Sequence, residues 1–204
     1  MRSFNTLTIA LMPIAIVINI ALGYLVSTLR IPFLYLDSVG TILVGVLAGP
    51  LAGGITGALA NIVWALILAD RVIIWFVPVA FVIGALAGIF GARSWLRKWY
   101  LTIIAGLITG VAAALLSAPI VVACCGGVTG AGTDLLVATF LQTTEDILSA
   151  SFLQGLVTEF IDKPLSYFLV YLVLNNLPRR LLVRFPQGEK TAPPRRRPLI
   201  GRVE

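Results

Sequence analysis

The sequence predicts an all-α integral membrane protein with about six transmembrane helices, and three observations carry this prediction. The chain is 59% apolar and only 12% charged, whereas soluble domains average roughly 45–50% and 25%. The mean hydropathy is +1.01. Several apolar runs approach the roughly 20 residues that a spanning helix requires. There is too little charge here to form the surface of a soluble protein.

The apolar runs give the positions of the first five helices. The stretch 37–69 is almost wholly apolar, and at about 1.5 Å per residue it is too long for one span. We divide it at Gly49–Pro50 into helices over 37–49 and 51–69. The remaining runs predict helices over 6–29, 72–92 and 101–123.

The last third of the chain is less regular. Residues 124–134 hold four glycines, which predicts a tightly turned external loop. Counting about 20 residues back from Asn176 places the outer end of the sixth helix near Leu156. Residues 134–153 then form a short extra helix that lies at the membrane surface or folds back. We expect a transmembrane domain over 1–178 and a basic cytoplasmic tail over 179–204, disordered beyond Phe185.

Basic residues predict the orientation in the membrane. With six spans both termini share one side, and that side then receives 12 of the 15 lysines and arginines. Cytoplasmic loops carry the excess of such residues. We therefore expect a multi-pass protein of the cell membrane with cytoplasmic N- and C-termini.

Composition also excludes several kinds of chemistry. The chain has no histidine, so imidazole bases, histidine-ligated metals and Ser-His triads are excluded. Its two cysteines, Cys124 and Cys125, are adjacent, a spacing that rarely suits disulfide geometry. No G-x-x-x-x-G-K-[ST] pattern is present, so the chain has no P-loop nucleotide site of its own. We expect no catalytic residue, no metal and no cofactor.

Small residues recur four apart along several helices. Gly49, Gly53 and Gly57 form one such series. This spacing lets helix backbones approach closely inside a membrane. The glycines therefore either pack helices within this chain or offer a face to another subunit.

The sixth helix carries the densest polar group in the sequence: Gln154, Thr158, Glu159, Asp162 and Lys163. Ionisable side chains within a membrane are costly and by default mark a site or a pathway. Glu159 and Lys163 are four residues apart, so they can form an ion pair on one helix face. The alternative is an interfacial ion pair that only anchors the helix.

Further polar and aromatic residues fall at the same outer level of the membrane, at the ends of helices two to four. They are Asp37, Asp70, Arg71 and Trp75, and Asn61 lies two to three helical turns deeper than Asp70. Together with the group on helix six they would suit a small polar or zwitterionic ligand in a water-facing cavity.

One segment resembles a known family. It reads Ile31-Pro-Phe-Leu-Tyr-Leu-Asp37-Ser-Val-Gly40-Thr41, then Gly49-Pro50-Leu-Ala-Gly53-Gly-Ile-Thr-Gly57 and Asn61. This run is similar to the loop and the second and third helices of S components. These proteins are the substrate-binding membrane subunits of energy-coupling factor (ECF) transporters. The resemblance spans about residues 5–177.

The resemblance implies a function. It implies a protein that captures a vitamin or related micronutrient outside the cell and then joins a transmembrane coupling subunit and two cytoplasmic ATPases. The family's ligand region corresponds here to 30–38, 69–72, 124–146 and the outer part of helix six. The family's coupling face is an Ala-x-x-x-Ala pattern on helix one, and here Thr6 and Ala10 keep that spacing of small residues.

Three other functions remain open on sequence alone. A stand-alone transporter or channel would need a polar path across the whole membrane, which the Gly-, Ala- and Val-rich inner halves of these helices do not provide. A membrane enzyme could use the carboxylates, but no reactive-serine elbow or H-E-x-x-H motif accompanies them. A sensor subunit that binds the same ligand without transporting it is the third.

Overall fold

The computed structural model describes residues 4–31, 33–130, 132–144 and 146–192. Within these ranges the protein is all-helical, and no strand occurs. Four helical segments there are long and apolar enough to cross a membrane: Thr6–Thr28, Pro50–Ile67, Ile73–Ala92 and Trp99–Cys125. The fold class is therefore all-α, and these segments suggest a multi-pass membrane protein.

Six helices form the body of the molecule. They are α1 (Thr6–Thr28), α2 (Val39–Ala48), α3 (Pro50–Ile67), α4 (Val77–Ala92), α5 (Trp99–Cys125) and α7 (Ile147–Asn176). Shorter helical turns join or follow them: η1 (Ile73–Phe76), η2 (Trp95–Arg97), α6 (Asp134–Phe140), α8 (Arg179–Leu182) and α9 (Gly188–Thr191). The predicted break at Gly49–Pro50 is confirmed, because Gly49 has a φ of +107° and Pro50 starts the next helix.

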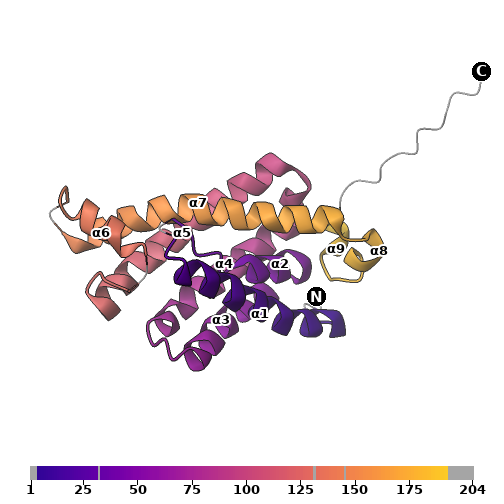
Figure 1. Ribbon diagram of the computed structural model, residues 1–204. Coiled ribbons are helices and arrows are strands. Elements are labelled where there is room, and N and C mark those ends of the chain that lie inside the picture. Colours follow the sequence, from indigo (N-terminus) through magenta and orange to yellow (C-terminus); the bar gives the residue numbers. More distant parts are fainter. Residues whose placement is uncertain (1–3, 32, 131, 145, 193–204) are drawn as a thin grey trace, which may run out of the picture.

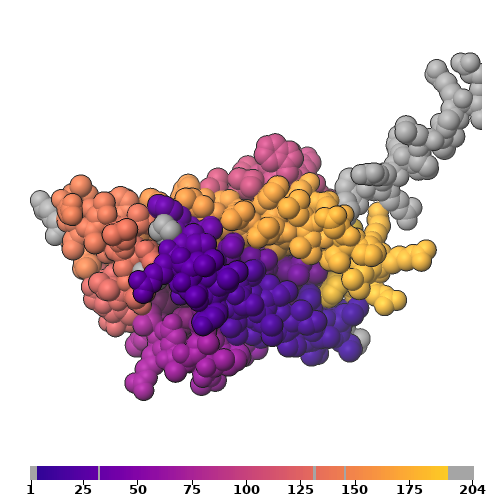
Figure 2. All heavy atoms as spheres, in the orientation of Figure 1, coloured from indigo at the N-terminus to yellow at the C-terminus, as the bar shows by residue number. Residues whose placement is uncertain are grey.

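The six helices run alternately between two ends of the bundle (Figure 1). One end, which we call the tail end, holds the start of α1, the end of α2 and the segment after α7. There Asn5 Nδ2 donates to the Arg184 carbonyl at 2.7 Å, and Gln187 N donates to the Leu47 carbonyl at 2.8 Å. At the opposite loop end lie the segment 29–38, helix α6 and the start of α7. Figure 2 shows α1 covering the middle of one face between these two ends.

Helix α2 is the centre of the fold. Nine of its ten residues are buried, and it packs against α1, α3, α4 and α7. At about 1.5 Å per residue it is only about 15 Å long, roughly half of a membrane span. The loop 29–38 therefore descends into the bundle to reach it, which leaves space at the loop end.

A side chain from α1 caps the start of α2. The first N–H groups of a helix lack partners within it. Here Asn19 Oδ1 accepts a hydrogen bond from Gly40 N at 2.7 Å, and Asn19 Nδ2 donates to Thr41 Oγ1 at 2.7 Å. Asn19 is fully buried, so this contact fixes the register between the two helices. The N-cap residue itself, Ser38, makes no capping hydrogen bond.

Glycines bring the helices into backbone contact. A Cβ added to Gly53 would lie 2.4 Å from the Gly84 carbonyl, and one added to Gly57 would lie 2.3 Å from the Ala80 carbonyl. Gly49 is also buried, beside Gln187. These three glycines are thus packed against this chain itself and present no free face for docking. Thr6 and Ala10, in contrast, are both exposed on α1.

The region before the last helix differs from the prediction. The short helix expected over 134–153 is the seven-residue α6, and residues 147–153 belong instead to α7. Asp146 caps α7 by accepting from Ser149 N and from Ser149 Oγ, both at 2.7 Å. The prediction placed the start of the last helix about 20 residues before Asn176, the length of one membrane span. Helix α7 has 30 residues, so its start and its cap lie outside that estimate.

The segment after α7 is also more ordered than expected. Residues beyond Phe185 include α9, and Leu182, Thr191 and Ala192 are at most 1% exposed. Leu182 and Phe185 join the main apolar core. Three buried apolar residues, Leu182, Phe185 and Ala192, are too few for composition to distinguish this segment from a disordered basic tail. Residues 193–204, the rest of the expected tail, lie outside the described part.

The two cysteines form a disulfide, contrary to the expectation from their adjacency. Cys124 and Cys125 are bonded to each other at the end of α5. Gly126, with a φ of +59°, ends the helix directly after them.

We predict that two glycine-to-alanine changes at the α5–α7 interface behave oppositely. A Cβ at Gly106 would meet Pro164 Cα at 2.5 Å, whereas one at Gly155 would meet Ala114 Cβ at 3.4 Å, an ordinary contact. Gly106→Ala should therefore lower the thermal unfolding temperature of the purified protein. Gly155→Ala should leave it unchanged or raise it, since alanine favours a helix by about 0.5–1 kcal/mol. Equal effects would contradict this packing.

Candidate ligand-binding site

A cavity of about 400 Å³ lies at the loop end of the bundle. Residues from α1, α3, α4, α5 and α7 line it, together with the loop 29–38 and the glycine-rich segment before α6. Its size is within the range of small-molecule sites, about 300–1,000 Å³. It occupies the space that a full-length α2 would have filled.

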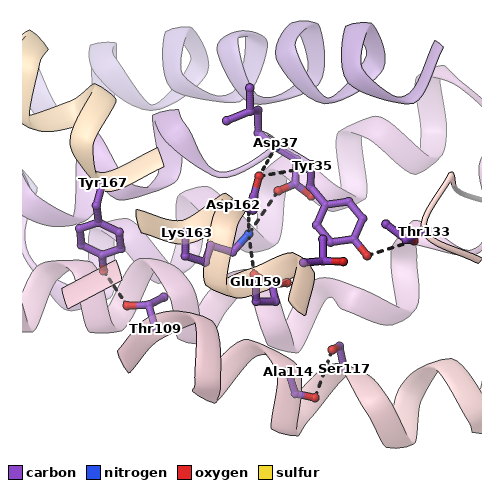
Figure 3. A network of polar contacts seen from close by, with 12 residues as sticks. Tyr35, Asp37, Thr109, Ala114, Ser117, Thr133, Glu159, Asp162, Lys163 and Tyr167 are labelled. Carbon is purple, nitrogen blue, oxygen red and sulfur yellow. Dashed lines mark hydrogen bonds and ion pairs between the residues drawn. The ribbon is translucent and has the colours of Figure 1, made fainter. Parts of the chain in front are cut away.

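A buried lysine joins three carboxylates beside this cavity (Figure 3). Lys163 Nζ lies 2.6 Å from Asp162 Oδ2, 3.2 Å from Glu159 Oε2 and 3.8 Å from Asp37 Oδ1. Lys163 is 1% exposed and Asp162 is fully buried. The predicted pairing of Glu159 with Lys163 is confirmed. We call Asp37, Glu159, Asp162 and Lys163 the charged cluster.

Asp162 ties the loop 29–38 to α7. Its Oδ1 accepts hydrogen bonds from Tyr35 N at 2.9 Å and from Leu36 N at 2.7 Å. Leu36 has a φ of +50°, a conformation uncommon for a residue with a side chain. One carboxylate thus neutralises Lys163 through one oxygen and holds a strained turn through the other.

Tyr35 connects the loop to two other walls of the cavity. Its hydroxyl lies 3.3 Å from Thr133 Oγ1 and accepts from Gln154 Nε2 at 3.2 Å. Its ring faces the Lys163 ammonium at 5.9 Å, within cation–π range. Burial raises the pKa of Tyr35 to about 12, so the hydroxyl remains neutral at physiological pH.

The glycine-rich segment before α6 is also held by a carboxylate. Asp134 accepts from Thr129 N at 3.1 Å, Thr129 Oγ1 at 2.9 Å and Gly130 N at 2.7 Å. Gly126, Gly127 and Gly130 have positive φ angles, which a turn of this kind requires. These hydrogen bonds hold Thr129 and Gly130 at the rim of the cavity.

The structure brings together most of the residues that the sequence singled out. Six of the ten candidates line the cavity: Asp37, Asn61, Asp70, Gln154, Glu159 and Lys163. Thr158 and Asp162 are fully buried behind this wall and hold other members of it, since Thr158 accepts from Gln154 at 3.0 Å. Arg71 and Trp75 line a separate shallow surface groove instead. Trp75 belongs to η1 and Arg71 precedes it, and both residues are exposed.

Sequence reasoning missed several lining residues. Tyr35, Ser38 and Trp64 all line the cavity. Tyr35 and Ser38 fall within the range 30–38 that the resemblance implied, but neither was singled out, and Trp64 lies outside that range among apolar neighbours. Trp64 follows the predicted Asn61 by one helical turn, so their shared face was the one available signal. Within the range 30–38 no pattern distinguishes Tyr35 from its neighbours, because its position depends on Asp162, 127 residues away.

Comparisons with protein-family models, curated proteins and solved structures found no match. Any functional inference therefore rests on the residues and geometry of this chain.

We predict that Asp162→Ala releases the loop 29–38. The change leaves the Tyr35 and Leu36 amides without their acceptor and removes the nearest of the three carboxylates around Lys163. Each buried donor left unsatisfied costs about 1–3 kcal/mol. Hydrogen exchange of residues 33–38 should become markedly faster. Asp146→Ala removes an exposed helix cap at a cost of about 1 kcal/mol and should leave exchange in this loop unchanged. Unchanged exchange in Asp162→Ala would contradict the role of this contact.

Proposed function

We propose that this protein is the substrate-binding membrane subunit of an ATP-driven importer of the ECF type. In this role it captures a small water-soluble vitamin or related micronutrient at the external face. The observation that carries the proposal is a cavity at one end of the bundle, bordered by buried charged side chains. At the tail end, in contrast, α8 and α9 pack against the apolar core that includes α2 and α4.

The proposal assigns six membrane spans and an orientation. Four spans follow from length and apolar composition. The other two are α2, which is short and enclosed by its neighbours, and α7, whose ionised residues face inward. We place both termini in the cytoplasm, in line with the basic residues of the tail end. The cavity then opens to the outside.

Ligand capture would proceed through the two loops that border the cavity. A ligand shifts a conformational equilibrium only by its different affinity for the two states. Contact with Asp37 or Tyr35 would favour the closed arrangement of the loop 29–38. The glycine-rich segment would close from the other side, since Thr133 contacts Tyr35.

Energy for transport would come from partner subunits. The sequence has no P-loop, so a transmembrane coupling subunit and two cytoplasmic ATPases would drive uptake. The exposed face of α1 is the surface that we assign to the coupling subunit. It includes Thr6 and Ala10, and Ile9, Ile14 and Val17 are each more than half exposed beside them.

Two measurements on the full-length protein test this proposal. In a thermal-shift screen against water-soluble vitamins and their precursors, a ligand at 100 times its Kd should stabilise the fold by about 2.7 kcal/mol. Affinity purification from the native membrane should also recover P-loop ATPases. Binding without ATPases would instead favour the stand-alone transporter or sensor. A failure of both measurements would overturn the proposal.

A further inference from the structure

We propose that the ligand of this cavity carries a positively charged nitrogen, held by the carboxylates of Glu159 and Asp37. This inference rests on the proposed function for the idea that the cavity holds a small solute. It adds the chemical class of that solute, an organic cation with an apolar or aromatic body. Four features of the cavity wall support it.

The first feature is the charge balance of the charged cluster. Three carboxylates, Asp37, Glu159 and Asp162, surround one ammonium group. In their ionised forms they sum to a formal charge of −2, that is, −3 from the carboxylates and +1 from Lys163. Asp162 is the closest partner at 2.6 Å and, being fully buried, does not line the cavity. Glu159 and Asp37 are the two members that face the cavity without full neutralisation.

The second feature is the shortage of positive charge for an anion. Lys163 also lines the cavity, but its three N–H donors have carboxylates at 2.6, 3.2 and 3.8 Å. A ligand carboxylate or phosphate approaching it would therefore meet Glu159 and Asp37 first. Like charges in a poorly hydrated site repel strongly, so the wall disfavours an anionic group here.

The third feature is a buried hydroxyl oxygen without a hydrogen-bond partner, next to a carboxylate that is held only by Lys163. Glu159 is 6% exposed, and the one cation near it among the described residues is Lys163, 3.2 Å from its Oε2. Ser38 is 4% exposed, and its Oγ has no partner in the described part of the chain. Asn19 has taken over the capping role that Ser38 would ordinarily have. Unsatisfied buried polar groups are costly. An N–H donor from a ligand would satisfy the Ser38 hydroxyl and add a second donor to the Glu159 carboxylate.

The fourth feature is the aromatic and apolar surface around these oxygens. Tyr35, Trp64 and Phe76 line the same cavity. Aromatic faces attract cations within about 6 Å of the ring centre, and they also accept an apolar ligand body. An inorganic cation fits less well, because Lys163 lies between the carboxylates. No group of three metal-binding side chains occurs among the described residues.

Matched probes that differ only in charge test this inference. We suggest phenethylamine, 2-phenylethanol and phenylacetate, with hexylamine, hexanol and hexanoate as an aliphatic series. Binding to the full-length protein in detergent is measured by calorimetry and by thermal shift. A hydrogen-bonded charge pair should favour the amine over the alcohol by on the order of 10- to 100-fold. The carboxylate of each series should bind weakest.

Substitutions in the cavity wall test whether Glu159 and Ser38 cause the preference for the amine. Glu159→Gln keeps the shape of the side chain but removes its charge, and it should abolish most of the preference for the amine. Ser38→Ala should weaken amine binding by a smaller factor while leaving the fold intact. Asp146→Asn alters an exposed carboxylate at the start of the same helix and should retain the full preference.

The outcomes separate this inference from the proposed function. Equal or tighter binding of the alcohol or the carboxylate, or no binding of either amine, would overturn the inference. Amine selectivity that persists in Glu159→Gln would overturn it as well. Recovery of ATPase subunits tests only the proposed function. A cation-selective protein that recovers no ATPases would therefore retain the inference and lose the importer assignment.

Discussion

The structure depends on one buried lysine and the carboxylates around it. Lys163 is 1% exposed within a bundle of apolar helices, where an unpaired charge would be very costly. Asp162, Glu159 and Asp37 offset that cost from α7 and from the loop before α2. This requirement holds the loop 29–38 against α7, since the same Asp162 side chain also binds two backbone amides of the loop. Stability and the shape of the cavity therefore have a common origin.

The short central helix supplies the space that the charged cluster borders. Helix α2 has ten residues, so it fills only the tail half of the bundle. Asn19 fixes its start from α1, and a Cβ at Gly40 would lie 2.2 Å from the Ala15 carbonyl. These contacts prevent α2 from shifting toward the loop end. The position at which α2 begins therefore sets the inner limit of the cavity, and the residues that fix this position also fix that limit.

The sequence predicted the parts of this arrangement that local rules govern. Apolar runs and the Gly49–Pro50 break located the first five helices, and the spacing of Glu159 and Lys163 predicted their ion pair. Contacts between distant segments followed no local rule, so the bond from Tyr35 to Asp162, 127 residues apart, was not anticipated. Membrane depth alone grouped Arg71 and Trp75 with the site. Depth does not give the direction of a side chain, and both residues line a separate surface groove. The glycine spacing predicted close packing correctly but could not say which helix would be the partner.

We propose that the cavity opens toward the outside of the cell, opposite the tail end. Cysteine labelling tests it most directly, in a background where Cys124 and Cys125, the chain's two cysteines, are replaced by serine. Ser38→Cys places a thiol in the cavity wall, and Lys190→Cys places one at the exposed tail end. A small membrane-impermeant methanethiosulfonate added to intact cells should modify Ser38→Cys, and Lys190→Cys only after permeabilisation. Modification of Lys190→Cys in intact cells, with Ser38→Cys protected until permeabilisation, would contradict the account.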